Sequence, residues 1–300
     1  MRSLGACLGL IAAAGAQEPR ALFSTRTDLV VLHAMVRDRR GEYLTGLSKD
    51  AFTVIEDGRP QTISFFAAED APVTVGLIVD NSGSMQPNRG RLAAAAEAFA
   101  AASHPQDEIF ALAFDETVRP ALPEAAPFTN DAPTLRDALG RTLNTRGRTA
   151  LFDAILDGLE YLERGHHERK VLVVVSDGGD NASRAAFADV IRRAQASNAL
   201  IYTVAILDPL DRESNPRLLR QVAEATGGEA FSPRDIGEIG SVLRRIARDI
   251  RHTYTIGYVS SNTARDGTFR TLRLMVQPPD GRRVVVRTRT GYLAASGGAC

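Results

Sequence analysis

The sequence predicts an α/β protein: a doubly wound, mostly parallel sheet with helices on both faces, inserted in a small antiparallel β-sandwich-like domain. Between residues 73 and 251, continuous apolar runs alternate with segments that have helical spacing. This alternation is typical of a parallel sheet that is covered on both faces. On either side of this region, short apolar runs are separated by Asp-Gly pairs, which favour tight turns between antiparallel strands.

Four apolar runs in the central region are expected to be strands of the parallel sheet. They lack strict alternation, as strands buried on both faces do, and they cover residues 73–79, 108–114, 170–175 and 199–207. Apolar residues at helical spacing predict helices between and after them, near residues 92–99, 151–162, 218–223 and 235–251. The stretch 118–128 returns without a helix, so we expect an antiparallel edge strand there.

The two flanks carry strand-like runs, at residues 29–36, 52–55, 62–66, 253–259, 269–276 and 283–290. Asp57-Gly58, Asp266-Gly267 and Asp280-Gly281 lie between several of these runs and are hairpin signals. Each flank alone is too small to make a stable sheet face. We therefore expect both flanks to pair into one antiparallel β-domain that contains the α/β unit as an insertion.

This organisation divides the chain into five expected parts. They are a signal peptide (1–16), the N-terminal half of the β-domain (24–72), the α/β domain (73–251), the C-terminal half of the β-domain (252–293) and a disordered tail (294–300).

The N-terminal residues predict export. Arg2 precedes a short apolar segment that ends in Ala14-Gly15-Ala16, as in a secretory signal peptide cleaved before Gln17. A membrane anchor is the alternative, but the segment is shorter than the roughly 18 apolar residues that a span needs. We expect an exported protein, periplasmic or extracellular, with no membrane span in the mature chain. Cys7 leaves with the signal peptide and Cys300 stays unpaired, so no internal disulfide is expected.

Charge and motifs exclude several classes of function. The chain has 36 basic and 36 acidic residues, so it has no net charge that would attract nucleic acid. It contains neither a phosphate-binding Gly-rich loop with Lys nor a Gly-x-Ser-x-Gly elbow. A phosphatase with Asp80 as nucleophile would need a second acid two residues later, where Ser82 stands. We therefore expect that the protein is not an enzyme.

Polar side chains follow the predicted strands at the carboxyl edge of the sheet, where doubly wound folds bind ligands. Asp80, Ser82 and Ser84 follow the first strand, Thr149 precedes a helix, and Asp177 follows the strand at 170–175. Their oxygens are hard donors, which Mg²⁺, Mn²⁺ or Ca²⁺ take as ligands. Thr149 could instead cap the helix that follows, and the Asp and Ser side chains could merely satisfy backbone groups of their loop.

The five residues resemble the metal-ion-dependent adhesion site of the von Willebrand factor type A domain, a Rossmann-like fold. That site combines Asp-x-Ser-x-Ser with a Thr from a later loop and an Asp after the fourth strand, and Asp80, Ser82, Ser84, Thr149 and Asp177 match it. The resemblance covers about residues 73–251. It implies hydroxyl ligands to the metal, carboxylates that act largely through water, and an open position that a Glu or Asp of a partner protein completes.

The flanks resemble a narrower group, the VWFA-related domain family described in acidobacteria. The segments that carry this resemblance are 36–41, 47–52, 56–58, 254–258 and 289–292. Membership in this group would indicate the architecture of the flanks but says little about activity.

We therefore expect a metal-ion-dependent protein-binding module of the adhesion type, holding Mg²⁺, Mn²⁺ or Ca²⁺. The alternative is a structural component of an envelope assembly, in which the metal only stabilises the fold. Asp153, Asp180 and Asn181 either orient the ligands or are ordinary loop residues. His166 and His167 lie in a charged stretch that we expect to be an exposed loop.

Overall fold

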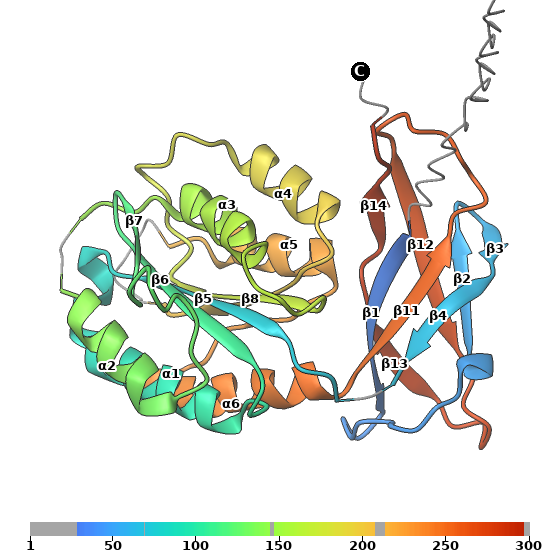
Figure 1. Cartoon of the computed structure of the whole chain (residues 1–300), viewed down its shortest axis with the longest axis horizontal. Coiled ribbons are helices and arrows are strands. Elements are labelled where there is room, and N and C mark those ends of the chain that lie inside the picture. Colours follow the sequence, from blue (N-terminus) through green and yellow to red (C-terminus); the bar gives the residue numbers. More distant parts are fainter. Residues whose placement is uncertain (1–28, 69, 145–146, 208–213, 297–300) are drawn as a thin grey trace, which may run out of the picture.

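The computed structural model describes residues 29–68, 70–144, 147–207 and 214–296 of the 300-residue chain. These residues form an α/β domain and, beside it, a β-sandwich (Figure 1). The signal peptide predicted at 1–16 and both cysteines lie outside the described residues. Among the described residues, no helix combines the length and the hydrophobicity that crossing a bilayer requires.

The central sheet of the α/β domain has the strand order β10-β9-β8-β5-β6-β7. All neighbouring strands are parallel except β7, which is antiparallel to β6 at the edge. The prediction of a mostly parallel sheet with an antiparallel edge strand is therefore confirmed, although the edge strand is shorter than expected. The strands are β5 (Thr74–Asp80), β6 (Glu108–Phe114), β7 (Val118–Pro120), β8 (Lys170–Ser176), β9 (Leu200–Ala205) and β10 (Ala230–Phe231).

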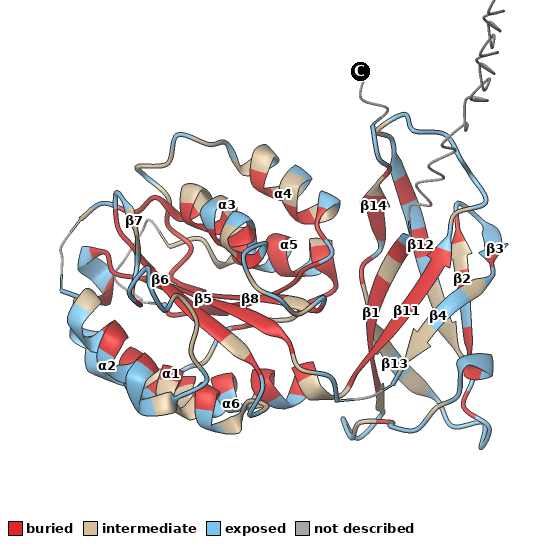
Figure 2. Cartoon of the chain, in the orientation of Figure 1, coloured by how far each residue is buried: buried red, intermediate tan, exposed pale blue. Residues whose placement is uncertain are grey.

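Helices cover both faces of this sheet, and the strands are buried between them (Figure 2). One face packs against α1 (Arg89–Ala102), α2 (Ala132–Thr142) and α6 (Ile239–Arg251). The other packs against α3 (Leu151–Leu162), α4 (Phe187–Ala196) and α5 (Pro216–Thr226). Short 3-10 helices, η2 (Gly83–Asn88) and η3 (Ile236–Glu238), precede α1 and α6.

Two of these helices, α2 and α4, were not expected from the sequence. Within α2 the buried side chains are Leu135, Ala138 and Leu139, and within α4 they are Val190 and Ala194. So few buried positions give a weak periodic signal, because the rest of each helix is polar or small.

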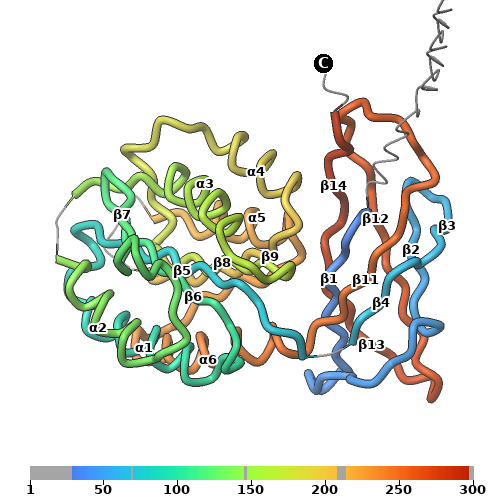
Figure 3. Tube along the Cα trace, viewed as in Figure 1, coloured from blue at the N-terminus to red at the C-terminus, as the bar shows by residue number. Residues whose placement is uncertain are grey.

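The β-sandwich consists of two four-stranded sheets, with the strand orders β13-β1-β11-β4 and β14-β12-β2-β3. Each sheet combines strands from both ends of the chain, and Figure 3 shows the blue and red segments interleaved. The insertion of the α/β unit is thus as predicted. The strands are β1 (Leu29–Asp38), β2 (Phe52–Glu56), β3 (Arg59–Gln61), β4 (Ile63–Ala67), β11 (Thr253–Val259), β12 (Phe269–Val276), β13 (Val284–Arg287) and β14 (Gly291–Leu293), and η1 (Lys49–Ala51) precedes β2.

One of the three Asp-Gly pairs forms a hairpin, although its second strand is β3 and not the run predicted at 62–66, which is β4 of the other sheet. Asp57 and Gly58 both have positive φ, 46° and 80°, and they join β2 to β3 with Glu56 opposite Arg59. The other two hairpin predictions are wrong, since β12 belongs to a different sheet from both β11 and β13. The turns at Gly267 and Gly281 therefore carry the chain from one sheet to the other.

The ordered chain continues beyond the predicted boundary at residue 293. Ala294 is buried, and its N–H donates to the carbonyl of Thr268 at 2.9 Å, while Ser296 bridges to Asp266. The tail predicted at 294–300 therefore begins too early, and residues 297–300 lie outside the described part. The divisions at 24–72, 73–251 and 252–293 stay predictions.

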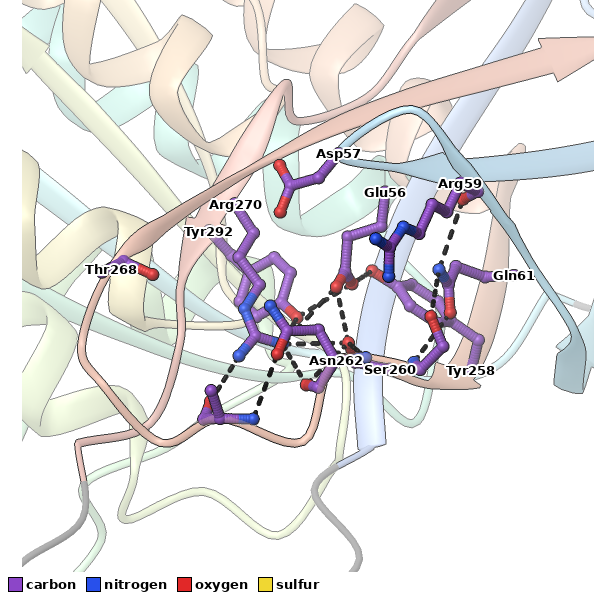
Figure 4. Close-up of polar contacts among 12 residues, drawn as sticks. Glu56, Asp57, Arg59, Gln61, Tyr258, Ser260, Asn262, Thr268, Arg270 and Tyr292 are labelled. Carbon is purple, nitrogen blue, oxygen red and sulfur yellow. Dashed lines mark hydrogen bonds and ion pairs between the residues drawn. The ribbon is translucent and has the colours of Figure 1, made fainter.

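A polar network lies inside the sandwich, around the buried carboxylate of Glu56 (Figure 4). Its Oε2 accepts hydrogen bonds from the hydroxyls of Tyr258 at 2.5 Å and Tyr292 at 3.0 Å. Its Oε1 accepts from Ser260 at 2.5 Å and faces the buried guanidinium of Arg270 at 3.4 Å. Burial and the hydrogen bond to Glu56 raise the pKa of Tyr258. Tyr258 and Tyr292 thus contribute to the interior of the sandwich.

Arginines of the sandwich form ion pairs with acidic residues of the α/β domain. Arg37 of β1 pairs with the fully buried Asp249 of α6 at 2.5 Å, and Tyr43 also donates to Asp249. Glu229 lies within 4 Å of Arg37, Arg245 and Arg287. Since four of these contacts join residues of different domains, they fix α6 and the start of β10 against the sandwich.

The sandwich lies at the amino ends of the central strands. Arg169, directly before β8, donates to the carbonyls of Ala71 and Ile250. Burial, together with the charges of Arg169 and Arg289, lowers the pKa of His33 in β1 to about 3. The carboxyl ends of the strands therefore point away from the sandwich.

We expect Glu56→Gln to lower the free energy of unfolding by about 3 kcal/mol, because it removes the negative charge that faces buried Arg270. Urea denaturation followed by circular dichroism measures this change. Glu42→Gln, at an exposed position, is the matched control and should change stability by less than about 0.5 kcal/mol. Equal denaturation midpoints for Glu56→Gln and the wild type would contradict the role assigned to the network.

Candidate metal site

Asp80 is the last residue of β5, and its carboxylate is completely buried. One oxygen, Oδ1, accepts a hydrogen bond from the backbone N–H of Ser82 at 2.8 Å. The other, Oδ2, accepts from the hydroxyl of Ser176 at 2.7 Å. Asp80 therefore shapes the loop that follows it and connects that loop to the end of β8.

The pKa of Asp80 is raised to about 6, chiefly by burial; hydrogen bonds from Ser82 and Ser176 act in the opposite direction, and the charge of Asp177 adds to the rise. A buried carboxylate is costly to ionise unless a positive charge lies nearby. A cation bound at this loop would supply that charge.

Asp177 follows β8 and is buried as well. Its Oδ1 accepts from the backbone N–H of Gly179 at 2.9 Å. The turn requires glycine at residue 178, which has a φ of 85° and whose added Cβ would lie 2.4 Å from the carbonyl oxygen of Asn215. The chain can thus bend sharply after Asp177 and leave its Oδ2 pointing toward the first loop.

Ser82 and Ser84 meet Asp177 where the loops after β5 and β8 approach each other. The hydroxyl of Ser84 donates to Asp177 Oδ2 at 2.7 Å, and the two serine hydroxyl oxygens are 3.1 Å apart. Although Ser82 stands at the N-cap position of η2, its side chain makes no capping hydrogen bond.

Thr149 is buried and lies in the loop before α3. Asn181 holds it from both sides: its side-chain oxygen accepts from the N–H of Thr149 at 2.9 Å, and its own N–H donates to the carbonyl of Thr149 at 2.9 Å. Thr149 does not cap α3, because the N-cap residue is Ala150 and the N–H of Phe152 bonds to Asp180 and Ser183. The capping interpretation is therefore wrong.

Four of the five predicted residues are linked by polar contacts, and the fifth, Thr149, shares a cleft with three of them. Asp80 contacts the backbone of Ser82, and Ser82, Ser84 and Asp177 form a chain of polar contacts. Among the described residues, the side chain of Thr149 makes no hydrogen bond to the other four, but Thr149 lines the same cleft of about 330 Å³ as Ser82, Ser84 and Asp177.

Two further residues hold the others in position, and sequence reasoning missed one of them. Ser176, which was missed, bonds to Asp80 and accepts from the N–H of Gly178 at 3.0 Å, yet it reads only as the end of an apolar strand. Asn181 is one of the three residues named as either orienting the ligands or being ordinary loop residues, and its contacts with Thr149 join two loops that are far apart in sequence. Neither role has a spacing that sequence alone reveals.

This set of oxygens fits a small hard cation. No group of three or more His, Cys, Asp or Glu side chains gathers as metal ligands in the described part of the chain, so hydroxyl groups would have to contribute. Mg²⁺ accepts few protein ligands and keeps several waters, and a cation would favour the ionised form of the buried Asp80, whose pKa is raised by burial.

Comparison with known proteins identifies the family of the α/β domain. Residues 75–179 match the family model described as the von Willebrand factor type A domain. The α/β domain is a von Willebrand factor type A domain. No curated protein sequence gives a significant match to the chain.

Two solved structures illustrate the similarity of this domain and its surroundings. One is described as von Willebrand factor type A from Catenulispora acidiphila, with a TM-score of 0.52 and 14% identity over 92% of this chain and 76% of that chain. The other is the PilB minor pilin from Streptococcus sanguinis, with a TM-score of 0.50 and 12% identity over 65% of this chain and 64% of that chain. At these identities the likeness is one of fold, and membership in the acidobacterial group stays a prediction.

The raised pKa of Asp80 predicts how the metal-free protein responds to pH. Unfolded chains lose this proton near 3.8 and the folded protein near 6, so stability falls as pH rises from about 4 to about 6. The difference corresponds to about 3 kcal/mol. We expect metal-free Asp80→Asn to lack this decrease and to exceed the metal-free wild type in stability at pH 7.

Denaturation midpoints of both proteins in chelator, at pH 4 and pH 7, measure the effect. The comparison cancels the opposite contribution of His33, whose lowered pKa costs stability as pH falls below its usual 6.5. Parallel pH profiles for the two proteins would show that Asp80 ionises normally.

Proposed function

We propose that the chain is a metal-ion-dependent protein-binding module, in which a divalent cation at the von Willebrand factor type A domain bridges to a carboxylate of a partner protein. The observation that carries this proposal is the contact between Ser84 and Asp177 at 2.7 Å. It brings the loops after β5 and β8 together in a cleft that Thr149 also lines.

The residues would divide the work as follows. Ser82, Ser84 and Thr149 would offer hydroxyl oxygens to Mg²⁺, Mn²⁺ or Ca²⁺, while Asp80 and Asp177 balance its charge. A bound cation supplies an electrophilic position that a partner's Glu or Asp can occupy. Asp80 and Ser176 hold the first loop to β8, Asn181 holds Thr149, and Gly178 allows the turn that presents Asp177.

The proposed role is not enzymatic. Both carboxylates at the cleft, Asp80 and Asp177, are buried and engaged in hydrogen bonds to the loops that contain them. A general base needs access to the proton that it removes, and these two acids are instead committed to loop structure.

Export to the periplasm or the cell exterior completes the proposal. It rests on the N-terminal signal-like sequence, and a minor pilin is among the solved structures that share the fold. If the chain were only a structural component of an envelope assembly, the metal would stabilise the fold without affecting partner binding.

We expect Mg²⁺ to raise the melting temperature of the protein. At a hundredfold excess over the dissociation constant, binding to the folded state adds about 2.7 kcal/mol, which corresponds to roughly 5–10 °C for a domain of this size. Differential scanning calorimetry with Mg²⁺ and with chelator measures the shift, which should disappear in Asp177→Asn. Asp137→Asn, on the exposed side of α2, is the control and should show the same shift as the wild type. An equal shift in the wild type, Asp177→Asn and Asp137→Asn would contradict the metal assignment.

Partner binding should depend on the same metal. Protein captured from the native envelope on the immobilised wild type in Mg²⁺ should be released by chelator and should be absent from a Ser84→Ala column. Recovery of the same partners with and without the metal would contradict metal-dependent binding, and the metal would then only stabilise the fold.

A further inference from the structure

Two clefts meet at the candidate metal site. The first, described above, is lined by Ser82, Ser84, Thr149, Asp177 and also Arg148. The second has a volume of about 290 Å³, and Ser84 and Asp177 line it together with Arg234. Because Ser84 and Asp177 belong to both clefts, each of the two arginines shares a cleft with the residues that would hold the metal.

Arg148 and Arg234 are both exposed, and neither guanidinium forms an ion pair or a hydrogen bond with the described residues. Many other arginines of this chain are committed, for example Arg119 to Asp115 and Arg164 to Glu124. Two positive charges that have no partner among the described residues lie beside a binding site and are available to a ligand.

Three acidic residues close to these arginines accept hydrogen bonds from backbone N–H groups, and one of them, Glu238, accepts from the N–H of Arg234 at 3.4 Å. Glu116 accepts from the backbone N–H of Arg148 at 3.2 Å, and Asp235 accepts from the N–H of Gly237 at 2.5 Å. Asp80 and Asp177 face the candidate metal position and would balance the charge of the cation. The guanidinium groups therefore remain the groups at this rim that can still bind a carboxylate, which they do in a planar, often bidentate geometry.

We infer that Arg148 and Arg234 select a partner whose metal-binding Glu or Asp lies within an acidic, extended segment. The inference rests on the proposed function and adds the class of ligand. The central carboxylate occupies the metal, and carboxylates on either side of it along the chain reach Arg148 in one cleft and Arg234 in the other. Positive charge at the rim also attracts such a segment before contact.

The second cleft offers room for the segment next to its central carboxylate. Its lining includes the buried apolar side chains of Met85 and Ile206. The charged residues Asp177, Arg234 and Asp235 line it as well. A segment that crosses this cleft can cover apolar surface while its acidic side chains stay at the rim.

Two synthetic peptides test the inference, both acetylated and amidated so that their termini carry no charge. One has five residues with Glu at the centre and Gly elsewhere, and the other has Glu at the first, third and fifth positions. In Mg²⁺ we expect the wild type to bind the second peptide about fivefold more tightly, since each exposed ion pair is worth a few-fold at most. Fluorescence anisotropy measures both affinities, and raising the salt concentration should reduce the ratio.

The double variant Arg148→Gln, Arg234→Gln should bind both peptides equally. The control double variant Arg59→Gln, Arg273→Gln removes the same charge from exposed positions of the sandwich and should keep the fivefold preference. This control variant separates the effect of losing contacts at the clefts from the effect of losing net positive charge. The melting temperature of each variant with Mg²⁺ and with chelator reports whether the fold and the metal site are intact.

Equal binding of the two peptides by the wild type in Mg²⁺ would overturn the inference while leaving the proposed function in place. A preference that persists in the Arg148→Gln, Arg234→Gln protein would overturn it as well. If neither peptide binds better in Mg²⁺ than in chelator, the proposed function itself fails. If phosphate at matched ionic strength abolishes the preference but leaves the single-Glu peptide bound, the arginines recognise phosphate, and the assignment of an acidic protein segment is wrong.

Discussion

The hydrogen bond from the Ser176 hydroxyl to Asp80 holds the candidate site together. Both residues are completely buried, and the bond joins the carboxyl ends of neighbouring strands β5 and β8 at 2.7 Å. Asp80 also fixes the N–H of Ser82, and Ser176 fixes the N–H of Gly178. The two loops that carry Ser84 and Asp177 therefore start from one shared polar contact, and the parallel register of the strands places them side by side.

This arrangement explains which parts of the site sequence reasoning could reach. Asp80, Ser82, Ser84, Thr149 and Asp177 follow or precede strongly patterned strands and helices, so their positions along the carboxyl edge follow from the fold class alone. The residues that orient them, Ser176 and Asn181, act through contacts between loops, and a single sequence contains no record of such pairing. Thr149 shows the same limit: its place directly before a helix suggested a cap, whereas Asp180 and Ser183 from another loop fill that role.

The elements of the fold also divide into those that the sequence predicted and those that it missed. Strands β5, β6 and β8 were predicted almost to the residue because they are buried on both faces and continuously apolar. Helices α2 and α4 bury few side chains and were missed. In the sandwich, Asp57-Gly58 forms the expected hairpin, but Asp266-Gly267 and Asp280-Gly281 form turns of the same chemistry between different sheets. Turn residues specify a local bend, and the choice of partner strand depends on the core that both sheets share.

The two connections between the α/β domain and the sandwich leave from neighbouring strands. Strand β4 leads into the insertion and β11 receives the chain from it, and these two strands pair antiparallel with Ala67 opposite Thr255. A short turn in place of residues 68–252 would thus close an ordinary hairpin and complete the sandwich as a continuous β-protein. The sandwich could therefore accept a different inserted domain between the same two strands, β4 and β11. The cost would be the exposure of His33, which is buried in the intact chain beside Arg169 and the backbone of Asn198 in the α/β domain.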